Sequence, residues 1–448
     1  MAVAPPSLAS PEAPRLVRAI GRWDLTAAVI NGVIGSAIFT MPASQAALTG
    51  AESPLVALVA GLGVLTIVLC FAEVASRFPE AGGPYLYVRE AFGPAVGFQA
   101  GWLTFWVRVT ALAANLNVFV EYAGVLAPPL GRSGGRFATM LAVVAVATAV
   151  NLRGVRQAAW TVNLFTVAKL APLALLVVLG LPHVRGDVLA TQAVVDPEWT
   201  KAILLLMFAY GGFEAPLIPA GEARDPRRDS AFALVLALFV VALVYFLIQL
   251  VVVGVVPHVA GTPAPLAAAF FLLVGPWGTT LAAGAAMTSI YGYATGNALQ
   301  SPRVLYSMAE GGDLPSPLAR VHARHRTPHV SILVYALVTL GLAASGTFES
   351  TATLSAIVRL VTYGLTCAAL LVLRKKRPRE APGFRLAGAP LLAPIAVAFC
   401  LWLLLSRSFA QAWMLLLIMA AGEVLGRGWR RLPKGPSPGL TSTPAGGK

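Results

Sequence analysis

Ionisable side chains inside apolar runs are the first candidates for chemistry in this chain. Lys169 lies in NLFTVAKLAPLALL, Arg108 lies in the apolar run 94–127, and Arg359 lies in the apolar run 351–373. In a run that crosses a bilayer a charge is costly, so it marks a functional site or a buried ion pair. Burial favours the neutral form of a lysine, and Lys169 can therefore take up and release a proton.

Two apolar runs are interrupted by residues that weaken a helix. NGVIGSA occupies 31–37, and Gly211-Gly212 are followed by Pro216 and Pro219. Backbone groups freed in hydrocarbon need partners, so broken helices are tolerated where they line a cavity. A half-helix offers N–H donors to an anion at its N-terminus and carbonyls to an ammonium at its C-terminus. The breaks predict a site for a zwitterion; close helix packing is the other role for such glycines.

The composition is that of a membrane protein. Hydrophobic residues make up 57% of the 448 residues and charged residues only 12%, and the mean hydropathy is +0.76. Soluble domains carry about 25% charged residues. About 20 apolar residues cross a bilayer, so we expect an all-α polytopic protein with about 12 transmembrane helices. The predicted spans are 23–47, 54–77, 94–127, 136–152, 157–181, 199–221, 230–256, 276–307, 329–345, 351–373, 386–406 and 408–426.

The distribution of basic residues predicts the orientation. With a cytoplasmic N-terminus, the segments expected inside carry 25 of the 33 lysines and arginines, and those expected outside carry five. This bias is typical of cytoplasmic loops, and it accounts for the net charge of +14 without nucleic acid. We expect an integral protein of the cell (inner) membrane with both termini cytoplasmic. We expect the Pro- and Ala-rich first 20 residues to be a short cytoplasmic tail rather than a cleaved signal peptide.

The two breaks lie five spans apart, which makes their helices antiparallel and predicts an inverted repeat with a site between its halves. The expected divisions are a cytoplasmic tail over 1–21, a first five-helix repeat over 22–182 and a second over 183–374. Two C-terminal transmembrane helices over 375–431 and a cytoplasmic tail over 432–448 complete the chain.

Several short motifs surround these breaks. They are GVIGSAIF at 32–39, FAEVASRFPEAGGPY at 71–85, GEARDPR at 221–227, SPRVLYSMA at 301–309 and RTP at 326–328. Together they resemble the amino acid–polyamine–organocation superfamily of transporters. The resemblance implies a leucine-transporter-like fold with a 5+5 inverted repeat and broken helices 1 and 6. It also implies an amino acid permease, a secondary transporter that moves amino acids or related amines by alternating access.

The resemblance also implies a substrate site. Backbone N–H groups of Gly35, Ser36 and Ala37 would face the substrate carboxylate, and Ala37 stands where the family often has glycine, so the backbone approach there is tighter. Carbonyls at both breaks would face the amine, from Val33, Ile34, Phe208 and Gly211.

Aromatic residues near the second break are candidates for shaping the site. The family places an aromatic gate over the substrate at the position of Phe208, and an ordinary packing contact is the alternative. Tyr210, Tyr291 and Tyr293 are weaker candidates for a side-chain pocket.

In proton-coupled relatives a lysine at the position of Lys169 resembles a replacement for bound sodium, bridging to the first break. Its role is proton coupling, a structural cation, or both. Arg108 and Arg359 are expected to form ion pairs with Glu214 or Glu121, or to meet an anionic substrate side chain. Glu73, Arg77, Glu222 and Arg224 are expected to form an inner gate or scaffold of ion pairs.

Three classes of function remain in competition. The first is a secondary transporter with an amino acid or amine substrate, driven by proton symport or by exchange. The second is a channel or sensor on the same scaffold. The third, a membrane-embedded enzyme, is disfavoured because all five histidines fall in loops and no catalytic motif lies in a span. Cys70, Cys367 and Cys400 are expected to pack inside spans, and no metal or cofactor is expected.

Overall fold

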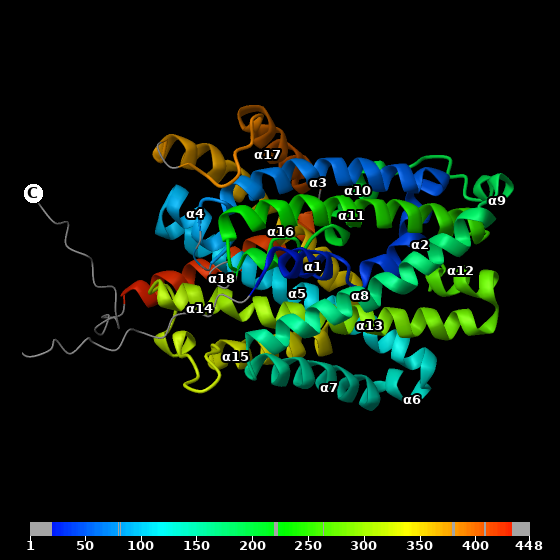
Figure 1. Cartoon of the computed structure of the whole chain (residues 1–448), viewed down its shortest axis with the longest axis horizontal. Helices are drawn as coiled ribbons and strands as arrows, with labels where there is room; N and C mark the ends of the chain where they lie inside the picture. The colour runs from blue at the N-terminus through cyan, green and yellow to red at the C-terminus, as the bar shows by residue number, and fades with distance from the viewer. Residues whose placement is uncertain are drawn as a thin grey trace, which may run out of the picture.

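The computed structural model describes residues 20–78, 80, 82–218, 223–262, 264–378, 381–406 and 409–431. These residues form a bundle of helices that run mostly along the long axis of the molecule (Figure 1). The α-helices are α1 Arg22–Val33, α2 Ala37–Thr49, α3 Ser53–Ala75, α4 Pro84–Phe92, α5 Pro94–Leu126, α6 Pro128–Gly131, α7 Ser133–Leu152, α8 Val155–Gly180, α9 Gly186–Ala190, α10 Trp199–Ala209, α11 Pro226–Val255, α12 Pro265–Val274, α13 Pro276–Gln300, α14 Pro302–Glu310, α15 His329–Ser345, α16 Phe348–Lys376, α17 Ala389–Leu405 and α18 Phe409–Arg431.

The apolar character predicted from the sequence is present in the helices. Six described helical stretches are long and apolar enough to cross a membrane, and four shorter helices, α10, α12, α15 and α17, are also apolar. Large apolar side chains such as Trp23, Leu62, Val167 and Leu337 are exposed on the outside of the bundle. An apolar outer surface of this kind suits lipid, and the chain is an integral membrane protein.

The first predicted span is two half-helices, as expected, but the break is shorter than 31–37. Asn31, Gly32 and Val33 still belong to α1, and the Ile34 N–H donates to the Ile30 carbonyl at 2.9 Å. The chain leaves the helix at Ile34, which has an extended ψ of 93°, and α2 starts with Ala37. The single glycine within the break is therefore Gly35.

The sixth predicted span is also interrupted. Of its described residues, 199–218, only Trp199–Ala209 is α-helical, and after it come turns and one short 3-10 helix, η3 Ala215–Leu217. Gly212 has a φ of +115°, a conformation that favours glycine. The two glycines therefore end α10 rather than merely bending it.

Other boundaries differ from the sequence prediction as well. The expected eighth span is divided at Ser301, because Pro302 lacks the N–H donor that would continue α13 and starts α14 instead. Four short helices of the described chain, α4, α6, α9 and α12, lie outside all the predicted spans.

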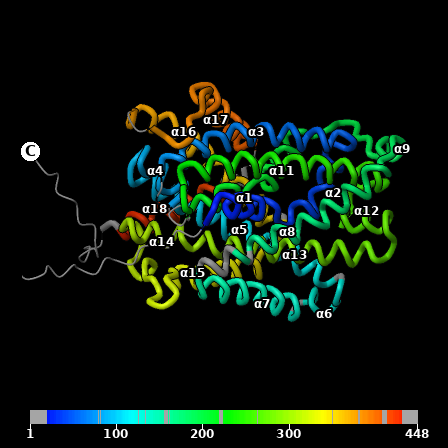
Figure 2. Tube along the Cα trace, viewed as in Figure 1, coloured from blue at the N-terminus to red at the C-terminus, as the bar shows by residue number. Residues whose placement is uncertain are grey.

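The two interrupted helices meet at their breaks in the middle of the bundle. A Cβ atom on Gly32 would lie 2.9 Å from the Gly212 carbonyl oxygen, so backbone touches backbone there. Around this contact α1 packs against α8, α11 and α13 (Figure 2). Elsewhere in the bundle α3 packs against α11, and α5 packs against α16.

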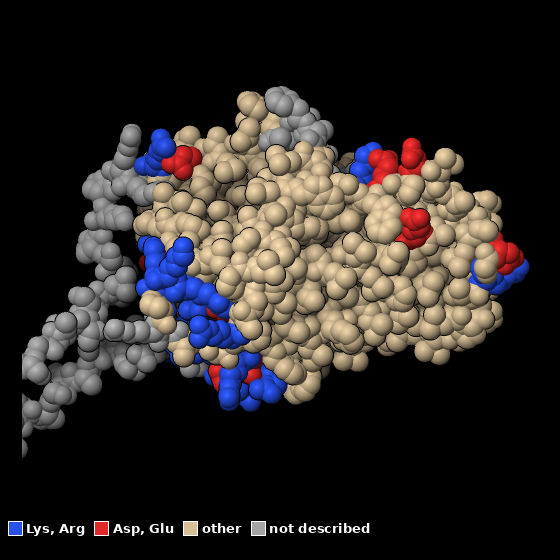
Figure 3. Space-filling model, turned by 90° about the horizontal axis from the view of Figure 1, so that it is seen from above, with Lys and Arg blue, Asp and Glu red and all other residues tan. Residues whose placement is uncertain are grey.

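Charged groups gather at the two ends of the molecule. On the face seen in Figure 3, lysine and arginine collect at the end that carries α4 and α14, which we call the basic end. Most of the surface between the ends is uncharged on this face. Cys70, Cys367 and Cys400 are free and buried, as expected.

Gly212→Ala tests the contact between the breaks. The substitution should lower the melting temperature of the protein in detergent, because an L residue at this φ is strained by about 1–3 kcal/mol and its Cβ would lie 2.0 Å from the Gly32 carbonyl oxygen. Gly284→Ala in α13 is the matched control, since a Cβ atom added there would have no other atom within 4 Å. Equal melting temperatures for the two variants would contradict the contact.

Candidate functional site

The anion-facing side of the first break is occupied by a side chain of α5. The Ser36 N–H donates to the Asn115 Oδ1 at 2.7 Å. A Cβ on Gly35 would lie 2.6 Å from the same oxygen and 3.3 Å from the Tyr293 ring. Asn115 therefore takes the place, at the N-terminus of α2, that was predicted for a substrate carboxylate. Ser36 and Ala37 are buried beside it.

The carbonyl side of the first break is held by Lys169 of α8. The Lys169 ammonium donates to the Ile34 carbonyl at 2.6 Å and lies 3.3 Å from the Asn31 carbonyl. Its side chain is 0% exposed. A cation at the C-terminal end of a half-helix is favoured by the helix dipole.

Hydroxyl groups from two further helices complete the partners of the first break. The Ser289 hydroxyl of α13 donates to the Gly35 carbonyl at 3.2 Å. The Tyr245 hydroxyl of α11 lies 3.3 Å from the Val33 carbonyl oxygen and 2.9 Å from the Ala209 carbonyl oxygen. Tyr245 thus contacts the C-terminal ends of α1 and α10, and its one proton can serve one carbonyl at a time.

The C-terminal end of α10 is held by Arg359 of α16. Its Nη1 donates to the Phe208 carbonyl at 3.2 Å. A Cβ on Gly211 would lie 1.4 Å from that nitrogen, so only glycine leaves room for the guanidinium. The Phe208 ring is buried and meets the Phe348 ring edge to face, with centroids 6.0 Å apart.

Glu214 lies at the centre of a buried charge cluster. Its carboxylate forms an ion pair with Arg108 and lies 3.9 Å from Arg359. It also accepts hydrogen bonds from the Tyr363 hydroxyl at 2.5 Å and the Gly212 N–H at 3.1 Å. Both arginines are 1% exposed and Glu214 is 2% exposed. Two guanidinium groups therefore share one carboxylate.

The other predicted side chains divide between this centre and its surroundings. Tyr293 belongs to the centre, where its ring faces Gly35. The Tyr291 ring instead pairs with Phe165 of α8 at 4.8 Å, and the Tyr210 hydroxyl donates to the Ala57 carbonyl of α3 at 2.8 Å. Glu121 is exposed, and the acid that pairs with Arg108 is Glu214.

Sequence reasoning missed Asn115, Ser289 and Tyr245. Their only signal was a polar side chain within an apolar run, which indicates an interior position in a membrane helix. Many serine, threonine and asparagine residues share that signal, so it could not show which of them reach a break.

Ion pairs at the basic end lie apart from this centre. Glu73 accepts from Arg77 at 2.7 Å and from Arg374 at 2.9 Å, and the three residues join α3 to α16. Glu222 lies outside the described residues, and the Arg224 side chain is exposed while its N–H donates to the Ile20 carbonyl at 2.9 Å.

A second ion-pair group at this end joins α4 to the segment after α14. Asp313 accepts from Arg89 at 3.0 Å and from the Tyr85 hydroxyl at 2.8 Å. Burial and the nearby Asp313 carboxylate raise the pKa of the Tyr85 phenol, so it remains a neutral donor.

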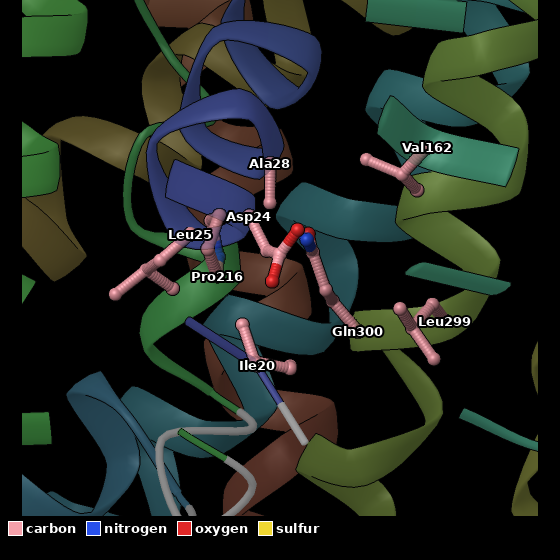
Figure 4. A pocket seen from close by; sticks show the side chains of 8 residues that line it. All are labelled: Ile20, Asp24, Leu25, Ala28, Val162, Pro216, Leu299 and Gln300. Atoms are coloured by element: carbon pink, nitrogen blue, oxygen red, sulfur yellow. The ribbon is translucent and has the colours of Figure 1, made fainter. Parts of the chain in front are cut away.

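A small pocket lies beside the start of α1, between it, α8, η3 and the end of α13 (Figure 4). Its polar lining is Asp24 of α1 and Gln300 at the end of α13, and the two side chains point toward one another in Figure 4. The Asp24 carboxylate accepts from the Asn163 amide at 2.6 Å and from the Gly21 N–H at 2.9 Å. The remaining lining residues are apolar: Ile20, Leu25, Ala28, Val162, Pro216 and Leu299.

Glu214→Gln tests the buried cluster. The variant should lose about 3–5 kcal/mol of stability, because removing one partner of a buried ion pair leaves a charge uncompensated. Asp187→Asn is the control, since Asp187 pairs with Arg185 on the exposed surface, and it should leave the melting temperature in detergent unchanged. Equal melting temperatures for wild type and Glu214→Gln would contradict the ion pair.

Comparison with known proteins agrees with this architecture. The family profile described as amino acid permease matches residues 20–425. The methylthioribose transporter of Bacillus subtilis (strain 168) is 27% identical, over 87% of this chain and 88% of its own length. The branched-chain amino acid permease BcaP of the same organism is 25% identical over 92% of each chain. The serine/threonine exchanger SteT of Bacillus subtilis (strain 168) is 27% identical, over 86% of this chain and 89% of its own length. The chain belongs to the amino acid permease family.

Proposed function

We propose that this protein is a secondary active transporter that moves an amino acid or a related amine across the membrane by alternating access. The observation that carries the proposal is the meeting of two interrupted helices in the middle of the bundle, where side chains rather than helix hydrogen bonds pair backbone groups at each break. Such breaks at membrane depth bind substrates in transporters. The names of the relatives support this function, since each is a transporter, permease or exchanger.

The substrate head group binds at the first break. Its carboxylate displaces the Asn115 amide and accepts from the N–H groups of Gly35, Ser36 and Ala37, because Asn115 Oδ1 already marks an acceptor position there. Its amine binds at carbonyls around the two breaks. Those carbonyls belong to Val33, Ile34, Phe208 and Gly211.

Lys169 couples transport to protons. Its ammonium bridges the carbonyls of Asn31 and Ile34 inside the bundle, and loss of its proton would remove the positive charge that strengthens both hydrogen bonds. A buried lysine exchanges its proton readily because burial disfavours the charge. An arginine would not, since its guanidinium stays charged. Exchange of one substrate for another remains the second mode of operation.

The membrane arrangement follows from the charge pattern. The basic end faces the cytoplasm, with both termini there. Phe208 gates the substrate from its position at the end of α10. The helices are related as a 5+5 inverted repeat over 22–182 and 183–374, followed by two further transmembrane helices.

The proposal is tested by counterflow in proteoliposomes. Vesicles loaded with unlabelled L-amino acids should accumulate the labelled form of the transported one, with uptake that saturates. Saturation and counterflow distinguish a carrier from a channel, which would conduct without either. A panel of neutral, acidic and basic amino acids and amines that gives no counterflow would contradict the proposal.

Lys169→Ala should lower the uptake driven by an imposed pH gradient at least about tenfold. It should retain counterflow without a gradient. Lys201→Ala is the control, because Lys201 is exposed and pairs with Glu198 at the bundle surface. Retained counterflow shows that the variant is folded. Proton-driven uptake at the wild-type level in Lys169→Ala would rule out this residue as the coupling site.

A further inference from the structure

Building on the proposed transport of amino acids, we infer that the substrate has an anionic side chain whose carboxylate binds between Arg108 and Arg359. The sequence and the relatives leave the side chain open, and the relatives' names point to neutral substrates. The inference rests on the charges and contacts at the second break.

The cluster around Glu214 has more positive than negative charge. Arg108 and Arg359 are both buried, and they are close enough to repel each other. Glu214 is the acid that pairs with them among the described residues, and it contacts Arg108 much more closely than Arg359. Guanidinium groups stay charged in proteins, so the cluster carries an excess positive charge that deprotonation cannot remove. A buried charge needs a partner, and an anion is the missing one.

Both arginines also have N–H donors without a hydrogen-bond partner in the described part of the chain. The Nε atoms of Arg108 and Arg359 are buried and have no hydrogen-bond partner among the described residues. The planar guanidinium is suited to a carboxylate, which can accept two parallel hydrogen bonds from it. Beside the ion pair with Glu214, the two groups therefore keep Nε donors that a second carboxylate could use.

The position of the pair fits the end of a substrate side chain. Arg359 lies directly against Gly211, and Glu214 accepts from the Gly212 N–H. Gly212 in turn touches Gly32, immediately before the first break. The Tyr293 ring, within electrostatic range of both arginines, lies against Gly35. The charge cluster and the head-group site are therefore neighbours in the bundle.

The α-carboxylate is the other anion that a substrate could bring to the arginines. The N-terminus of α2 is the better match for it, because Asn115 Oδ1 already occupies an acceptor position there, next to the carbonyls that suit the α-amine. The arginines are then left for a second carboxylate. L-Glutamate and L-glutamine separate the two possibilities, since they share the α-carboxylate and have side chains of nearly equal shape.

The test is competition in wild-type proteoliposomes. L-Glutamate or L-aspartate should inhibit counterflow of the transported amino acid at least about tenfold more strongly than L-glutamine or L-leucine. L-Glutamate, and not L-glutamine, should also raise the melting temperature in detergent. Preference for L-glutamine or L-leucine would overturn the inference while leaving amino acid transport intact. Failure of every amino acid to give counterflow would overturn the proposed function itself.

Arg359→Gln gives an independent test at the residue. The variant should lose the preference for L-glutamate over L-glutamine by tenfold or more, whereas Arg359→Lys, which keeps the charge, should lose less. Arg185→Gln is the control, because Arg185 is exposed and pairs with Asp187. Unchanged preference in a folded Arg359→Gln would overturn the inference, and should that variant not fold, the wild-type competition decides.

Discussion

The structure depends on satisfying the backbone carbonyls that two interrupted helices leave free inside the bundle. Water is absent from a bilayer core, so these groups need partners from the chain itself. Lys169 serves the end of α1 and Arg359 serves the end of α10. When each interrupted helix is counted as the first span and the short helices are left out, each cation lies on the fifth span: α8 for the break after α1, and α16 for the break after α10. An inverted repeat would produce this relation, because a buried cation would then bind the carbonyls at the end of the first half-helix in each half of the chain.

Lys169 and Arg359, the cations at the two breaks, differ in whether they can lose their charge. Lysine can give up its charge when buried, while arginine keeps it. The first break therefore has a partner that can change state, and the second has a permanent charge that draws in Glu214 and Arg108. Gly211 makes the second arrangement possible, because any side chain there would collide with the Arg359 guanidinium. Gly211 and Arg359 thus determine both the close packing at the second break and the permanent positive charge there.

Much of this was accessible from sequence, because breaks and buried charges leave local signals. Glycine and proline marked both interruptions, and Lys169, Arg108, Arg359 and Glu214 were notable as charges within apolar runs. The limits of the first break were predicted too widely, since Asn31 and Gly32 keep helical hydrogen bonding inside a packed bundle. The role of Asn115 could not be predicted, because only the packing of α5 against the first break brings it to Ser36. Polar residues of this kind are identified by long-range contacts, which one sequence does not record.

The backbone bridge between Ile20 and Ala223 has a consequence for how the interrupted helices are joined. It ties the start of α1 to the chain that follows the second break, and the Arg224 N–H reinforces it. The glycine contact at 32 and 212 ties the same two segments again, about 18 Å further along α1 at 1.5 Å per residue. The two interrupted helices are therefore joined to each other by backbone contacts at two separate levels along α1, one near its start and one near its end.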